Sequence, residues 1–325
     1  DYNPYRECIQ GLSNEPICVR YTVSKAWTVA QTLDASLDPG DITLEEIVHR
    51  LEINRPRIAV ITGSIDHPAH LRDDIHISLA VLRIWQNGGV PFVFGIPVIC
   101  DGTAQNNIGM SYSLASRNHT ASAVNITFEG HSYHAAYVLS SCDKFPSAVI
   151  CGLAAADVAR SHPQRGQAPV WAVFIPEHVL KGGTIPEKTR SRLNLVMEKA
   201  REQGHADLAE DIAENMRYIL QCSSNEAFVG LLKRGIPLGL LTSEEYRKIL
   251  NELAAATCET KGGICAFNGT GNSSRTLVSA LGLTPPEAEL LMDAPVSAVV
   301  SECVDMLFRS LNRKELRITN VLERN

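Results

Sequence analysis

The sequence predicts an α/β protein built on a largely parallel sheet flanked by helices, an α/β/α sandwich. Short apolar runs of strand length alternate with longer segments of helical periodicity. Reactive polar side chains stand directly after several of these runs, and the carboxyl ends of strands are where open α/β sheets bind ligands. The chain has 325 residues, of which 45% are hydrophobic, so it is long enough to bury a substantial core.

The signals for secondary structure are weak in the first 40 residues and clear after them. Residues 1–40 have little periodicity, and we expect an arm of uncertain structure there. Thr43 and Glu46 have capping-box spacing, and the apolar stripe after them predicts a helix of about two turns. The β-branched run 58–61 predicts a buried strand. We therefore divide the chain into residues 1–54, an arm and helix, and residues 55–325, the main α/β domain.

The later elements continue the alternation of strand and helix. They are expected in this order: a helix ending at Trp85, apolar runs in 90–100, a helix in 113–129, a strand from Ala136, a helix in 151–160, a strand in 170–175, mostly helix in 186–253 and a helix in 297–311. Residues 258–275 contain four glycines and two thiols. Such a loop can bring backbone N–H groups and a thiolate to a ligand, but it can also be a plain surface connection around a buried cysteine.

Three unlike side chains follow the strand predicted from Ala136. Cys142 offers a soft thiolate, Asp143 a hard carboxylate and Lys144 an amine. This combination can serve two different metals at one strand end. The ordinary alternative is a core cysteine followed by a solvated turn.

Composition limits the classes of partner. The formal net charge is −6 and no basic block stands out, which gives little electrostatic case for nucleic acid. No apolar run approaches the ~20 residues that span a bilayer, and the first residues lack the order of a signal peptide. Nine cysteines, an odd number without any CxxC pair, favour thiols or metal ligands over a disulfide framework. We expect a cytoplasmic protein that binds a small molecule.

An ordered set of motifs resembles the dihydroxy-acid and sugar-acid dehydratase family, which includes phosphogluconate dehydratase. The motifs are Asn87-Gly-Gly-Val-Pro-Phe92, Cys100-Asp101-Gly102, Gly109-Met110 through Arg117, Cys142-Asp143-Lys144, and Cys265 followed by Asn272. No single motif is specific, but their order is. The resemblance covers about residues 55–325.

The resemblance implies a chemistry and a set of ligands. Members of the family remove water from a 2,3-dihydroxy carboxylate to give a 2-oxo-3-deoxy acid, using a two-iron two-sulfur cluster and a magnesium ion. By position, Cys142 and Cys265 would be cluster ligands, and Asp101 and Asp143 would be magnesium ligands. Lys144 would be a carboxylated lysine that also binds magnesium. Soft sulfur for iron and hard oxygen for magnesium agree with this assignment.

The chain also departs from the family pattern. Where the family has its first cluster cysteine, counting back from His70-Leu71-Arg72 gives His67. Imidazole can bind iron in such clusters, so His67 is either the third ligand or an ordinary loop histidine. The family's Gly-His becomes Asn106-Asn107, and its Gly-Gly-Pro-Met stretch becomes 175–178. These changes leave the substrate open.

The resemblance assigns no catalytic base within these residues. In the family a C-terminal β-barrel carries the base and a further ligand. We therefore expect the large, cluster-bearing subunit of a divided hydro-lyase, with a separate β-barrel partner and an oligomeric assembly. Two alternatives stay open: a catalytically silent paralogue that acts as a binding or partner subunit, and a zinc hydrolase that uses His67, Cys142 and Cys265.

Overall fold

A four-stranded parallel sheet forms the centre of the fold. The structure is a computed structural model that describes residues 15–34, 37–40, 42–104, 108–259, 261–265, 270–288, 290 and 296–324. The strands are β1 (Arg57–Gly63), β2 (Val90–Ile96), β3 (Ala135–Ser140) and β4 (Trp171–Pro176), in the order β2-β1-β3-β4. Pro91 lies on the edge strand β2, where its missing N–H removes no ladder bond. The predicted fold class is confirmed.

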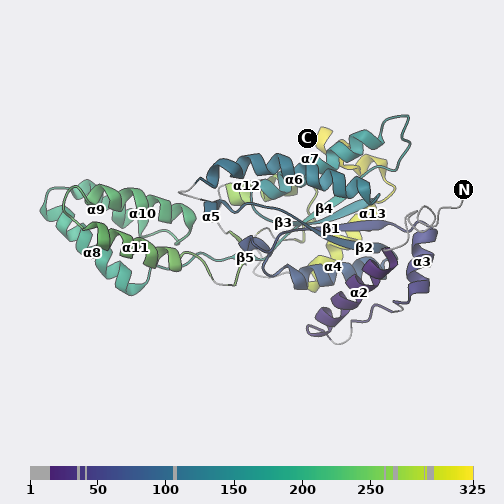
Figure 1. The fold of residues 1–325 in the computed structure, drawn as a ribbon, viewed down its shortest axis with the longest axis horizontal. Coiled ribbons are helices and arrows are strands. Elements are labelled where there is room, and N and C mark those ends of the chain that lie inside the picture. Colours follow the sequence, from purple (N-terminus) through teal and green to yellow (C-terminus); the bar gives the residue numbers. More distant parts are fainter. Residues whose placement is uncertain are drawn as a thin grey trace, which may run out of the picture. The chain divides into compact units, whose positions relative to one another are not determined.

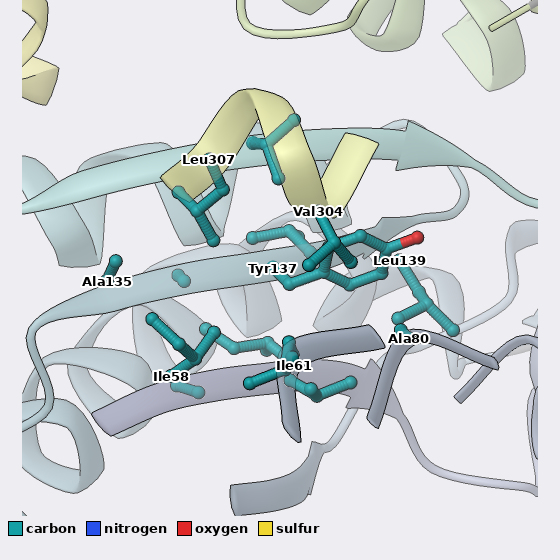
Figure 2. Packing of buried hydrophobic residues seen from close by; sticks show 14 of the residues in the cluster. Ile58, Ile61, Ala80, Ala135, Tyr137, Leu139, Val304 and Leu307 are labelled. Carbon is teal, nitrogen blue, oxygen red and sulfur yellow. The ribbon is translucent and has the colours of Figure 1, made fainter. Parts of the chain in front are cut away.

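Helices cover both faces of this sheet (Figure 1). On one face lie α2 (Glu15–Gln31), α4 (Asp73–Gln86) and α13 (Ser297–Ser310), and on the other lie α6 (Met110–Gly130), α7 (Lys144–Arg160) and α12 (Thr270–Ala280). The shorter elements are α3 (Leu44–Glu52), η1 (Pro68–His70), α5 (Asp101–Ala104), η2 (Lys314–Leu316) and α14 (Ile318–Glu323). Figure 2 shows side chains of α4 and α13, among them Ala80 and Val304, packed beside Tyr137 and Leu139 of β3.

The described residues form two compact units. The first contains the sheet and comprises residues up to Val179, Gly262–Ile264 and Asn268–Asn325. The second, Leu180–Lys261 with Cys265–Phe267, contains α8 (Glu187–Glu202), α9 (Ala206–Asn215), α10 (Cys222–Gly235) and α11 (Ser243–Ala255). Its helices enclose their own apolar cluster, which includes Leu193, Ile212, Phe228 and Leu253. The predicted boundary at residue 54 stays a prediction.

Several predicted elements have the expected limits. Thr43 caps α3 by accepting a hydrogen bond from the N–H of Glu46 at 3.2 Å, as the capping-box spacing suggested. Other elements differ from the prediction, α2 and α7 among them. α2 is a regular helix inside the predicted arm, and its buried residues Val19, Val23 and Ala26 join the main core. α7 begins at Lys144, seven residues before the predicted start, because Pro146 fits in the first helical turn.

β5 (Val179–Leu180) and β6 (Ile264–Cys265) form a short two-stranded sheet, and the chain passes between the units within both strands. Residues 106 and 107, where the sequence departs from the family's Gly-His, lie outside the described residues. Among the helices that the structure describes, none has the length and apolar character needed to cross a bilayer.

Candidate metal and substrate site

The candidate site lies at the carboxyl ends of three neighbouring strands of the first unit. The loop after β1 carries His67, α5 after β2 begins with Asp101, and the segment after β3 carries Cys142, Asp143 and Lys144. The strand order reverses between β1 and β3, where loops diverge and leave room for a ligand. The fold therefore brings together residues that are separated by up to 77 positions in the sequence.

Lys144 is the centre of this group. Its Nζ lies 2.6 Å from Oδ1 of Asp101 and 3.1 Å from Oδ1 of Asp143. The lysine side chain is 6% exposed, whereas the Asp101 side chain is 36% exposed, so the pair opens to solvent on the carboxylate side. The Ser113 hydroxyl donates to the same Asp101 oxygen, and the Ser274 hydroxyl donates to the Asp143 carbonyl oxygen. Two helices besides α7 thus fix the site.

The two carboxylates keep Lys144 charged. Burial lowers the pKa of the Lys144 amine, but its hydrogen bond to Asp101 and the charges of Asp143 and Asp101 outweigh burial and raise that pKa. An ammonium group therefore sits between two carboxylates, in the place where a divalent cation would be attracted. These contacts join three residues that the sequence analysis assigned to one metal site, and their role as metal ligands stays a prediction.

His67 is buried within electrostatic range of Lys144 and Asp101. Its side chain caps the 3₁₀ turn η1, because Nδ1 accepts a hydrogen bond from the N–H of Ala69 at 3.0 Å. Burial lowers the pKa of His67 to about 4, and the electrostatic interactions of His67 with His70 and Lys144 act in the same direction. His67 Nε2 is buried and has no hydrogen-bond partner among the residues that the structure describes.

A second buried group, formed by His70, Asp73 and Thr62, contacts His67 through the His70 ring. The sequence analysis did not identify this group. His70 Nδ1 lies 2.6 Å from Oδ2 of Asp73 and 3.2 Å from the N–H of Gly63. Thr62 donates its hydroxyl to the same carboxylate oxygen of Asp73. The His70 ring also packs against His67, with ring centroids 5.6 Å apart. The i, i+3 spacing of His70 and Asp73 is the only sequence signal for this contact.

A third buried group joins α4 to the end of β4. Glu177 is fully buried, with Oε1 3.0 Å from Nδ1 of His76 and Oε2 3.5 Å from Nδ1 of His178. Neither carboxylate oxygen of Glu177 has a hydrogen-bond partner with suitable geometry among the described residues. His76 Nε2 lies 2.7 Å from the hydroxyl of Tyr137. Burial raises the pKa of Glu177, but His76 and His178 outweigh burial and lower it to about 2.

The two predicted cluster cysteines lie in different units. Cys142 is half-buried between β3 and α7 in the first unit, and Cys265 is half-buried in β6 and belongs to the second unit. The residue before Cys265 is anchored in the first unit, since Ile264 donates its N–H to the His178 carbonyl at 2.9 Å. The convergence of Cys142 with Cys265 stays a prediction.

The donor set fits magnesium in part. Asp101 and Asp143 present hard carboxylate oxygens to one point, which Lys144 Nζ now occupies. Within the described stretches, no group of three or more His, Cys, Asp or Glu side chains has the arrangement needed to hold a metal ion. A carboxylated Lys144 would add a third oxygen donor at that point. The residues therefore suit a hard cation once the lysine is modified.

The fold and the site define a doubly wound α/β protein with a carboxylate and lysine centre at the strand ends. A family profile described as "Dihydroxy-acid/6-phosphogluconate dehydratase N-terminal" matches residues 55–306. The chain therefore belongs to the dihydroxy-acid/6-phosphogluconate dehydratase family, and the matched residues correspond to its N-terminal domain.

Similar proteins carry one name. A dihydroxy-acid dehydratase of Desulfitobacterium hafniense is 29% identical over 238 residues, which cover 72% of this chain and 33% of that protein. The dihydroxy-acid dehydratase of Desulfatibacillum aliphaticivorans is 36% identical over 239 residues, covering 72% and 34%. That of Clostridium pasteurianum is 27% identical over 254 residues, covering 77% and 68%. The chain spans about a third of the length of the first two relatives.

Proposed function

We propose that this chain is the metal-bearing part of a hydro-lyase. The reaction is the dehydration of a small 2,3-dihydroxy or sugar acid to a 2-oxo-3-deoxy acid. The observation that carries the proposal is the contact of Lys144 with Asp101 and Asp143, at the strand ends of a chain that belongs to this dehydratase family. The relatives named dihydroxy-acid dehydratase support the same reaction class.

The proposed roles follow the donor chemistry. Asp101, Asp143 and carboxylated Lys144 would hold magnesium, and Cys142 and Cys265 would hold a two-iron two-sulfur cluster. When bound, these groups supply Lewis acidity at the 2- and 3-hydroxyl groups of the substrate. Ser113 orients Asp101 through its hydroxyl, and Ser274 holds the backbone at Asp143. Lys144 thus acts as a metal ligand and takes no proton from the substrate.

The base is proposed to come from a β-barrel partner, because the resemblance assigns that role to no residue of this chain. General-base catalysis contributes typically ~10²–10⁴-fold, so these residues alone should turn over substrate very slowly. We propose further that the substrate is a small hydroxy acid. The protein would act with its partner in an oligomeric assembly in the cytoplasm. Neither nucleic acid nor a membrane is part of it.

The test is an anaerobic assay of 2-oxo acid formation with a set of 2,3-dihydroxy acids. The chain is assayed alone and after addition of the β-barrel part of a related dehydratase. We expect activity only in the mixture, and Asp143→Asn should abolish it while Asp66→Asn, an exposed neighbour of the site, should not. Turnover by the chain alone would refute the need for a partner. A protein that binds the acids without turnover in any mixture would instead be a binding subunit.

A further inference from the structure

The hydrogen bond at turn η1 decides which nitrogen of His67 carries hydrogen. A backbone N–H can only donate, so the bond from Ala69 N to His67 Nδ1 requires a lone pair on Nδ1. An imidazole with a bare Nδ1 is neutral and carries its one hydrogen on Nε2. His67 therefore points an N–H group, not a lone pair, away from the turn.

This arrangement is the reverse of a metal-binding histidine. A histidine that binds a metal uses the lone pair of one nitrogen and donates from the other, usually to a carboxylate or a carbonyl. His67 accepts with the nitrogen that would have to donate. Binding of iron through Nε2 would move the hydrogen to Nδ1 and remove the cap of η1.

The turn that carries His67 is held on both sides. The N–H of Gly263 donates to the Pro68 carbonyl at 2.8 Å. Gly262 has φ +78, and a Cβ there would lie 2.9 Å from the Pro68 oxygen, so the glycine loop fits closely against η1. On the other side, Asp73 fixes the His70 ring that packs against His67. The position of His67 is therefore fixed by contacts among three segments: the turn η1, the loop with Gly262 and Gly263, and the start of α4.

We propose that His67 is a hydrogen-bond donor of the site and does not ligate iron. Its Nε2–H would bind an anionic acceptor held beside Asp101 and Lys144, either an oxygen of the substrate or a sulfide of the cluster. The inference rests on the proposed function for the identity of the acceptor, but not for the assignment of the hydrogen. The buried Nε2, which lacks a partner within the described residues, is the second observation behind it.

Two conservative variants separate donor from ligand. His67→Asn keeps a cap, because its side-chain oxygen can accept the Ala69 N–H, but it loses the Nε2 donor. His67→Gln can place an amide N–H close to the position of Nε2. If His67 is a donor, both variants reconstituted anaerobically should hold as much iron and sulfide as the unchanged protein. Loss of the cluster in both variants, with recovery in His67→Cys, would show that His67 is a ligand.

The position of the hydrogen can be measured without any metal. In metal-free protein labelled with ¹⁵N-histidine, the His67 signal is assigned by its absence in His67→Asn. We expect the one-bond N–H coupling at Nε2. A hydrogen found on Nδ1 would overturn the inference, whatever the cofactor turns out to be. This measurement can therefore refute the hydrogen assignment of His67 whether or not the proposed function is correct.

The acceptor is identified by the effect of His67→Asn. If the acceptor is a sulfide, the reduction potential of the substrate-free protein should fall, because a hydrogen bond to sulfur stabilises the reduced cluster. If the acceptor is a substrate oxygen, kcat/KM of the complete enzyme should fall by about 10- to 100-fold, the usual worth of a hydrogen bond to a charged group. His67→Gln should restore part of either loss. Unchanged values of both quantities in His67→Asn would contradict the donor role.

Discussion

Lys144 and the two carboxylates beside it form an ion group, and its ammonium occupies the point at which we propose that magnesium binds. Carboxylation of a lysine requires a neutral amine, and the contacts at 2.6 and 3.1 Å oppose loss of the proton. A divalent cation that enters between Asp101 and Asp143 would repel the ammonium and favour the neutral amine. Modification of Lys144 and binding of magnesium should therefore depend on each other.

We predict that Lys144 takes up carbon dioxide only when magnesium is present. Protein incubated with ¹³C-bicarbonate and magnesium should show a carbamate signal by ¹³C nuclear magnetic resonance. The signal should be absent from Lys144→Met, and it should be much weaker after magnesium is removed by a chelator. Equal uptake with and without magnesium would show that the carboxylates do not control the amine.

The residues of the site were predictable to different degrees. Asp101, Asp143 and Lys144 follow β2 and β3 within five residues, so the parallel sheet brings them to the same edge. The contact of His70 with Asp73 and the burial of Glu177 depend on side-chain distances across several elements. The sequence alone does not predict whether a histidine or a glutamate is buried in this way. These two groups could not be derived before the fold was known.

At the scale of the elements, β1, η1 and α4 meet at Gly63. A Cβ at this position would lie 2.2 Å from Nε2 and Cδ2 of His70, so the ring fills the space that a larger residue would need. Glycine is needed here because of this close approach of the His70 ring. The backbone φ of Gly63 is not positive, so the backbone conformation would allow other residues. Gly63 thus lets His70 pack between the strand and the helix that carries Asp73.

Gly63→Ala should displace His70 and lower the free energy of unfolding by about 1–3 kcal/mol, the usual cost of overpacking. Gly130→Ala is the matched control, because outside its chain neighbours and its own helix backbone no atom lies within 4 Å of the added Cβ. Chemical denaturation of both variants measures the difference. If both variants unfold at the same denaturant concentration as the unchanged protein, the His70 packing has no energetic weight.

Glu177 links α4 to the end of β4 and gives the protein a pH-dependent contribution to stability. Burial acts against its charge, yet His76 and His178 lower the pKa of Glu177 from 4.5 to about 2. A carboxyl group whose pKa is lower in the folded state stabilises the fold above its unfolded pKa. That contribution is lost as the pH falls from about 4.5 towards 2.

We predict that the unchanged protein loses on the order of 3 kcal/mol of stability across this pH window through Glu177. Glu177→Gln has no charge to titrate, so its stability should change less over the same range. Thermal unfolding at a series of pH values compares the two proteins. Parallel profiles would mean that the carboxyl group of Glu177 has the same pKa in the folded and unfolded states.

Elements with a strong local signal were predictable, and those fixed by tertiary packing were not. The capping residues of α3 and the β-branched run of β1 are local, and both were predicted. The buried face of α2 includes two alanines, Ala26 and Ala30, so its apolar stripe is weak in the sequence. The weak apolar stripe of α2 is nevertheless buried, because the helix packs against α4 and β2.

At the scale of the whole molecule, the two units have separate apolar clusters, although no flexible linker marks a boundary in the sequence. The physical reason is that the chain passes between them inside two short strands, β5 and β6. Strand residues are apolar and show no change in composition. A division of this kind can be found only from contacts.

Our proposal, which is supported by the family match and the arrangement at the strand ends, is that this chain carries an iron–sulfur cluster next to a hard cation site. The most direct measurement is the iron and acid-labile sulfide content of the protein purified without oxygen, together with the electron paramagnetic resonance spectrum after reduction. We expect brown protein with equal iron and sulfide, at the amount of one two-iron cluster per chain, and a spectrum that disappears in Cys142→Ser. Colourless protein that contains zinc or no metal, before and after anaerobic reconstitution, would contradict it.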